Sequence, residues 1–208
     1  MPLWGTTHDS ATNKPKFLTT DEDSDYTRQD SYATQSGWVM QAGLASSGND
    51  NTSADPEVLV AIGGLAGASS STGLRTPTPT AMRFITGSTA ATDLTAGSSS
   101  QTILVEVTWD EAVTVAGSPT LAIANGNEGS GSGRGPYTCV YTATGSTANR
   151  KRFILASQTI AEDDVLTIGG ANIALAGGTI SDTVVGGTTL AAVLVLSGLT
   201  AVTHTVLA

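Results

Sequence analysis

The sequence predicts a mainly β protein built around an antiparallel β-sandwich, and three observations support this fold class. Apolar and polar residues alternate over Ile103–Trp109, which is the two-residue period of a strand with one buried face. A Gly-Ser-Pro turn at 117–119 follows, and a second short apolar run begins at Leu121. No segment carries a convincing helical stripe of apolar residues. The pattern is therefore typical of an adhesive or structural module.

The chain divides into three regions. Residues 1–36 are polar with widely spaced aromatics, so we expect an extended N-terminal arm that becomes ordered on a partner. Residues 37–80 hold two apolar runs, 37–41 and 57–62, which we expect to pair as a small antiparallel β-ribbon before a Gly/Ser/Thr-rich linker. Residues 81–208 carry the short, turn-separated runs of a sandwich. Its expected strands are 81–86, 102–109, 119–123, 137–144, 152–155, 165–168, 172–175, 188–196 and 201–207.

Charge and hydropathy exclude several classes of protein. The chain has 9 basic and 18 acidic residues and a net charge of −9, which repels phosphate backbones and argues against nucleic-acid binding. Its most apolar segment, Leu190–Leu196, is far shorter than the roughly 18 residues of a membrane helix. Residues 1–8 lack the basic and apolar regions of a signal peptide. We expect a soluble protein made in a host cytoplasm, with no membrane partner.

Several segments of the third region resemble the bacterial Ig-like repeats of large surface adhesins. The opening of the unit is matched by Thr95-Ala-Gly-Ser, Ile103-Leu-Val-Glu-Val-Thr-Trp-Asp-Glu-Ala-Val-Thr-Val115 and Gly117-Ser-Pro-Thr-Leu121. Its middle and end are matched by Tyr141-Thr-Ala-Thr, Ala161-Glu-Asp-Asp-Val-Leu166 and Gly177-Gly-Thr-Ile-Ser-Asp182. The likeness covers about residues 90–182, with an enlarged loop at 125–136 and an apolar tail in place of a second repeat. It implies that the sandwich is an Ig-like domain.

A second resemblance points to a virion. Leu3-Trp-Gly5, Lys14-Pro-Lys-Phe-Leu18 and Gly37-Trp-Val39 are similar to the amino ends of small structural proteins in T4-like marine and cyanobacterial phages. Tailed-phage structural proteins often carry a single Ig-like domain. The two resemblances together imply a structural virion protein, and we expect a cement or decoration protein on the capsid surface. The alternatives are a tail, baseplate or neck component, and an Ig-like module that binds a host surface or carbohydrate.

We expect the arm and the ribbon to bind the major capsid protein, and copies of the chain to meet around a symmetry axis, with a trimer as the first candidate. A Trp in a segment without a core of its own is suited to anchoring on a partner. The proline-extended run at 14–18 is suited to docking along a groove or a sheet edge. The expected capsid-binding residues are Trp4, Lys14, Lys16, Phe17, Leu18, Tyr26 and Trp38.

Candidate chemistry is sparse, so we expect neither an enzyme nor a cofactor. His8 and His204 have no catalytic motif around them. The acidic runs 21–25 and 162–164 could hold calcium but lack the spacing of an EF-hand loop, which favours solvated acidic faces and no metal site. The glycine-rich loop 129–135 lacks the Lys-Ser/Thr of a phosphate-binding loop. The single cysteine, Cys139, excludes an intrachain disulfide and lies in a strand-like run, which favours a buried side chain over a reactive thiol.

Overall fold

The computed structural model describes residues 14–20, 27–66, 74, 76–86, 89–90, 97–126, 136–182 and 189–206. These residues are mainly β, and their regular strand pairings are all antiparallel, which confirms the coarse fold class expected from the sequence. Two short 3-10 helices, η2 (Arg28–Asp30) and η3 (Ala45–Ser47), are the helical elements of the described part. The strands are β1 (Ser31–Thr34), β2 (Gly37–Met40), β3 (Glu57–Ala61), β4 (Pro79–Thr86), β5 (Thr89–Ala90), β6 (Gly97–Trp109), β7 (Val113–Ala116), β8 (Thr120–Asn125), β9 (Tyr137–Thr142), β10 (Arg150–Ile160), β11 (Val165–Ile168), β12 (Thr179–Asp182) and β13 (Val202–Thr205).

The first three strands form a separate sheet, here called the N-terminal sheet, in the order β1-β2-β3. The predicted antiparallel pairing between the runs at 37–41 and 57–62 is confirmed by the β2–β3 register. Residues 31–34 were expected to belong to the extended arm, but the structure places them in β1, paired with β2 from Ser31 opposite Met40 onward. The burial of three of the four β1 residues explains why this segment is a strand.

Gly37 is the residue that lets β1 turn tightly into β2. Its φ of +128° is unfavourable for L side chains, and a Cβ built there would lie 2.0 Å from the Val60 carbonyl oxygen. The turn is completed by the Thr34 hydroxyl, which accepts from Ser36 N at 3.2 Å and donates to the Gly37 carbonyl at 3.1 Å. The sequence Thr-Gln-Ser-Gly thus closes the hairpin and allows β3 to approach.

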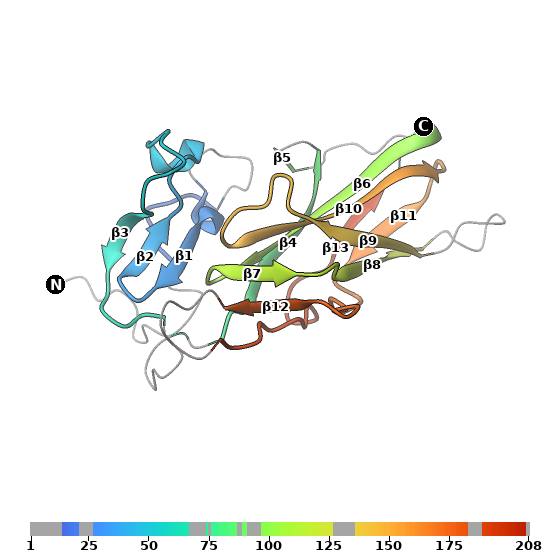
Figure 1. Cartoon of the computed structure of the whole chain (residues 1–208). Coiled ribbons are helices and arrows are strands. Elements are labelled where there is room, and N and C mark those ends of the chain that lie inside the picture. The colour runs from blue at the N-terminus through green and yellow to red at the C-terminus, as the bar shows by residue number, and fades with distance from the viewer. Residues whose placement is uncertain are drawn as a thin grey trace.

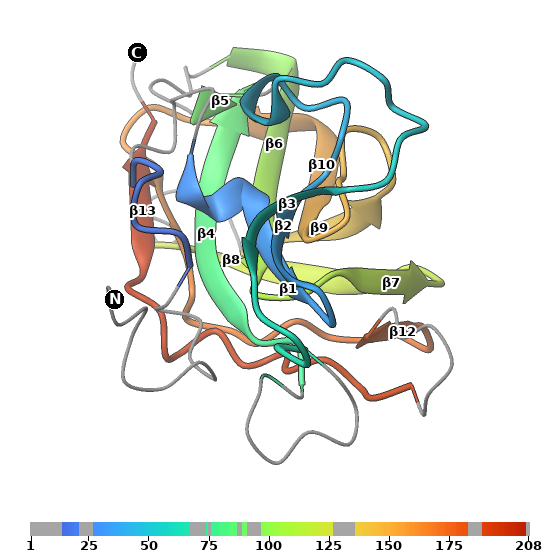
Figure 2. The same cartoon turned by 90° about the vertical axis from the view of Figure 1, so that its left-hand side faces the viewer.

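The remaining described strands form the part of the molecule here called the body. Its large sheet has the order β13-β11-β8-β9-β10-β6-β4-β5, and β7 pairs separately with β12. The sheet curls on itself, because the Phe84 ring of β4 lies 6.0 Å from the His204 ring of β13 although several strands separate the two in the sheet order. Figure 1 shows the N-terminal sheet at one end of the curled body, and Figure 2 views the molecule from that end.

The core of the body lies inside the curl. The alternating residues that predicted the central strand are all completely buried: Ile103, Val105, Val107 and Trp109. They pack with residues of β4, β8, β9, β10 and β11, and also with Ile173, Ala192 and Leu196 from irregular segments. The indole Nε1 of Trp109 donates to the Val193 carbonyl at 3.2 Å, which fixes the C-terminal segment on the core. The predicted core position of Trp109 is confirmed.

Two expected strands are not regular strands. Within 172–175 and the described part of 188–196, pairing is limited to the isolated bridges Thr120–Ala174 and Ser181–Ala191. Ile173 N donates to the Leu194 carbonyl at 3.1 Å, and next to this bond the Asn172 side-chain oxygen, not a main-chain carbonyl, accepts from Leu196 N at 3.3 Å. Two strands, β7 and β12, were not expected from the sequence. They pair with each other, with Val113 opposite Asp182.

Candidate interaction surface

The outer edge of the N-terminal sheet, formed by β3, is an exposed strand edge. β3 lies at the end of the strand order, and no residue of β3 is fully buried. Val58 on this strand is 52% exposed, although valine is usually buried. A bulge shifts the register where Trp38 and Val39 meet Val60 and Val58. β3 also faces away from the body (Figures 1 and 2), so a partner strand could reach it.

The expected docking run at 14–18 is held by one arginine. The Arg28 guanidinium donates to the carbonyls of Pro15, Lys16 and Leu18 at 3.1, 3.2 and 3.1 Å, and Arg28 N donates to Thr19 at 2.7 Å. These bonds satisfy the main chain of a segment that has no strand partner of its own. As a result Lys16 is exposed, Leu18 is half-buried and Phe17 is 60% exposed. The structure therefore presents Phe17 as an aromatic side chain on a fixed backbone.

The other expected binding residues are placed differently. Trp38 is 1% exposed and belongs to the core of the N-terminal sheet with Leu65 and Leu74, so its indole does not contact a partner in this conformation. Its role is internal packing, because β2 is buried over its whole length. Lys14 is buried as well, and its charge lowers the pKa of the nearby Asp110 carboxyl against the larger effect of burial. Trp4 and Tyr26 lie outside the described residues.

A buried ionic network joins the N-terminal segment to the outer face of the large sheet. Glu106 Oε1 accepts from Arg83 Nη2 at 3.0 Å and from Arg150 Nη1 at 3.1 Å, while its Oε2 accepts from Arg152 Nε at 3.2 Å. Arg150 also pairs with Asp30 Oδ1 of η2 at 2.9 Å. Burial raises the pKa of Asp30, and the Arg150 guanidinium opposes that shift. Because a charge in a low-dielectric site needs partners, this network ties the two parts together in one geometry.

Neutral hydrogen bonds extend the same junction. The Asn149 amide donates to the Gln29 carbonyl at 2.9 Å and to the Trp109 carbonyl at 3.1 Å. The Gln41 side chain accepts from Ala148 N at 2.7 Å. The bonds of Asn149 to Gln29 and of Ala148 to Gln41 fix the β9–β10 connection to the N-terminal segment. Neither Asn149 nor Gln41 was predicted from the sequence.

The junction also has an acidic end, which the sequence pattern did not predict. Asp110 and Glu111 directly follow the core residue Trp109, and both are almost fully buried. The Asp110 carboxylate accepts from Thr78 N at 2.6 Å, while its carbonyl accepts from Ala33 N of β1 at 2.7 Å. Burial raises the pKa of Asp110 to about 6. In the sequence, Asp110 and Glu111 are two acidic residues at the end of an apolar strand. Such a pair ordinarily indicates a solvated turn, so their burial was not expected.

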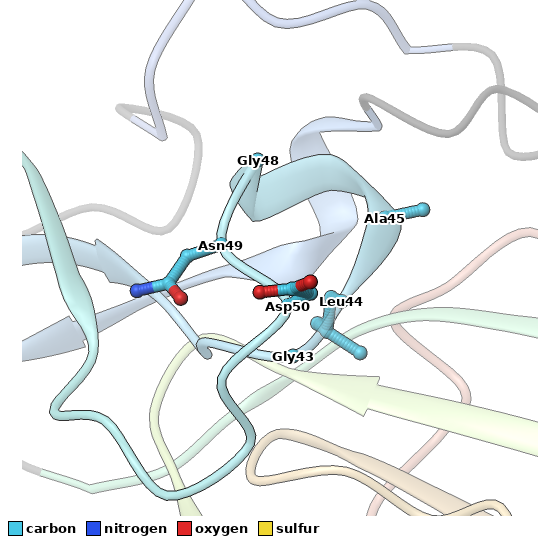
Figure 3. Close-up of a pocket in the computed structure, with 6 residues that line it drawn as sticks. All are labelled: Gly43, Leu44, Ala45, Gly48, Asn49 and Asp50. Atoms are coloured by element: carbon cyan, nitrogen blue, oxygen red, sulfur yellow. The ribbon is translucent and has the colours of Figure 1, made fainter.

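One open hollow lies on the loop between β2 and β3, beside η3. It has a volume of about 430 Å³ and is lined by Gly43, Leu44, Ala45, Gly48, Asn49 and Asp50 (Figure 3). Its polar side chains are the Asn49 amide and the Asp50 carboxylate, and the amide is bonded to Glu57 at 2.8 Å. One carboxylate and one amide do not make a nucleophile and base pair. The hollow gives no support to catalysis.

Other reactive groups are also placed in structural settings. Cys139 is buried in the core, and burial raises the pKa of its thiol to about 12. This finding agrees with the expected buried side chain. Among the described residues, no group of three or more His, Cys, Asp or Glu side chains is arranged to hold a metal ion.

Among the described residues, no helix is long and apolar enough to cross a bilayer. Comparison with known proteins found no match to this chain among family models, curated proteins or solved structures.

Proposed function

We propose that this chain is a structural protein of a tailed-phage virion, a cement or decoration protein that binds and stabilises the major capsid shell. In this proposal the body is an Ig-like β-sandwich, and the N-terminal segment is the docking part. The resemblances of residues 90–182 and of the segments around Trp4, Phe17 and Trp38 are the first support. They indicate the class of protein, and the exposed elements indicate how it would bind.

The observation that carries the proposal is the exposed edge of β3. An edge strand with unpaired main-chain groups can accept an extended segment of another chain as an additional strand. Val58 provides an apolar contact at this edge, and Phe17 provides a second one on the segment held by Arg28. Main-chain pairing would give affinity, and Val58 would help to fix the register.

Shell stabilisation follows from repetition of such contacts. An ordinary interface covers about 800 Å² on each partner. A molecule that spans two neighbouring capsid subunits would add this buried area to the shell, and the area must be lost before the subunits separate. Repetition around a symmetric shell converts modest single contacts into high avidity. We further propose self-association around a symmetry axis, as a trimer in the first instance.

The test compares two valines of similar exposure. Val58 (52% exposed) lies on β3, and Val195 (49% exposed) lies on the body. Val58→Lys should reduce the occupancy of this chain on capsid shells at least tenfold, because a lysine on an edge strand opposes strand addition. Val195→Lys should bind like the parent chain. Occupancy is measured by co-sedimentation with shells that lack the chain, and equal binding of the two variants would contradict docking at β3.

Copy number tests the location in the virion independently. Quantitative mass spectrometry of intact particles should find hundreds of copies, as expected of a shell component. Six or twelve copies would instead place the chain in the tail, baseplate or neck, and absence from the particle would overturn the virion proposal.

A further inference from the structure

A buried carboxyl group lies where β1 of the N-terminal sheet meets the body. Ala33 of β1 and Glu111 form a bridge between the two parts, and Ala33 N donates to the Asp110 carbonyl at 2.7 Å. Glu111 is 2% exposed. Its Oε1 atom has no hydrogen-bond partner. An ionised carboxylate with an unpaired oxygen is costly at such a site, whereas a protonated one is tolerated.

The charges around Glu111 make ionisation harder still. The charged groups that face it are Asp110, its neighbour on the chain, and Asp182 on β12. Both are acidic, and the nearby cation Lys14 acts on Asp110. The Asp110 carboxylate has Thr78 N as a donor, but Glu111 Oε1 has no such donor. Burial and these two acids together raise the pKa of Glu111 to about 8.

We propose that the carboxyl group of Glu111 is a proton-controlled clasp, which holds β1 on the body while it is protonated and loosens β1 when it is ionised. An ionised Glu111 would lie beside two other acids in a site that excludes water. The least costly response is to open the Ala33–Glu111 bridge, because this admits water without exposing the core around Trp109. The clasp does not depend on the identity of the partner.

The location of the clasp gives the transition a defined consequence. On the far side of the junction, η2 remains tied to Arg150 through Asp30 at 2.9 Å. Opening at Ala33 therefore loosens β1 at this end, while η2 and Gln41, which accepts from Ala148 N at 2.7 Å, keep the N-terminal sheet attached at the other end. The N-terminal sheet, with its exposed β3, would move relative to the body when the proton leaves. A docking element would thus respond to pH in the neutral range.

Amide hydrogen exchange of the full chain tests the proposal. Peptides covering residues 31–40 report the N-terminal sheet, and peptides covering 103–109 report the core. After correction for the intrinsic pH dependence of exchange, protection of 31–40 should fall at least tenfold between about pH 6 and pH 9 and should stay below that of 103–109 throughout, so that 31–40 exchanges while the core is still protected. This window brackets the pKa of Glu111, which is raised to about 8. Exchange of both peptides with the same protection across this range would mean that they open together by global unfolding and would overturn the clasp, as would constant protection of 31–40.

Variants assign the effect to its residue. Glu111→Gln carries no ionisable group and should keep 31–40 protected at pH 9. Asp182→Asn removes one repelling charge and should shift the midpoint of the loss to lower pH. Asp55→Asn, at an exposed loop position, is the matched control and should titrate like the parent chain. Should Glu111→Gln fail to fold, the Asp182→Asn midpoint decides, and an unchanged midpoint there would overturn the assignment.

Discussion

Arg150 on β10 and Asp30 on η2 form an ion pair of 2.9 Å, in which both side chains are largely buried. Arg150 also contacts Glu106 at 3.1 Å, so a single guanidinium bridges an acid of the N-terminal segment and an acid of the large sheet. This bridge connects regions that the sequence pattern assigns to different parts of the chain. It makes the junction a site where single substitutions should have large effects.

Removal of Arg150 should be strongly destabilising. Arg150→Met leaves Asp30 without its ion-pair partner and removes one of the three arginines on Glu106, and breaking a buried pair by deleting one partner costs about 3–5 kcal/mol. The free energy of unfolding is measured by urea denaturation. Lys16→Met is the control, since Lys16 is an exposed cation of the same N-terminal segment. A loss for Arg150→Met below about 1 kcal/mol, the range of exposed pairs, would contradict a buried network.

Gly37 should tolerate no side chain. In Gly37→Ala the new Cβ meets the Val60 carbonyl at 2.0 Å and the backbone stays at a φ of +128°, so β2 and β3 must separate. We expect a loss of at least about 2 kcal/mol, which is typical of a steric conflict added to a strained backbone. Gly63→Ala is the matched control, because nothing lies within 4 Å of a Cβ at that position. Equal unfolding midpoints for the two variants would show that β3 does not pack on Gly37.

Stability should fall as pH rises from about 4 to 8. Burial raises the pKa of Asp110 from 3.8 to about 6, and burial with two acidic neighbours raises that of Glu111 from 4.5 to about 8. The folded chain holds these protons after the unfolded chain has lost them, so their stabilising effect is complete at low pH and is lost as pH passes 6 and then 8. Each group changes the free energy of unfolding by at most about 1.4 kcal/mol per pH unit.

Urea denaturation across this pH range checks the sign. The double variant Asp110→Asn with Glu111→Gln should flatten the profile and be more stable than the parent chain at pH 8. A parent chain that grows more stable between pH 5 and pH 8 would contradict the burial of these acids.

Cys139 should be unreactive until the body unfolds. The thiol is buried, its Sγ lies 3.8 Å from the Ile103 carbonyl, and burial raises its pKa to about 12. Because the thiolate is the reactive form, a chromogenic disulfide reagent at pH 8 should label the native chain at least a hundredfold more slowly than the urea-unfolded chain. Fast labelling of the native chain would place Cys139 at the surface.

The sequence predicted those parts of the molecule that depend on local pattern. Alternation over 103–109 correctly assigned Ile103, Val105, Val107 and Trp109 to the core. The two runs at 37–41 and 57–62 correctly indicated a β2–β3 pair. The alternation with one buried face implies that the intervening Glu106 lies on the opposite, solvent-facing side of the strand, and the structure corrects the solvent exposure. Glu106 is on the outer face of the strand, yet it is 2% exposed because arginines from β4 and β10 cover it.

At the candidate interaction surface, too, the sequence predicted the exposure of one residue correctly and that of another incorrectly. Phe17 was expected at a docking surface and is exposed, whereas Trp38 was expected there and is buried. Both are aromatic residues with an apolar neighbour along the chain, Leu18 after Phe17 and Val39 after Trp38, so local composition does not separate them. What separates them is a partner distant in sequence: Leu65 and Leu74 cover Trp38, while Arg28 binds only the main chain around Phe17.

The sequence by itself determined a mainly β chain, its central strand and core, and a net charge of −9. These properties follow from side-chain periodicity and composition, which are local or additive. Only the tertiary structure decided which charges are buried, because the environment of Glu106, Asp110 and Glu111 is set by segments that meet through folding. The energy of a buried charge depends on those neighbours, and the order of residues along one strand does not contain them.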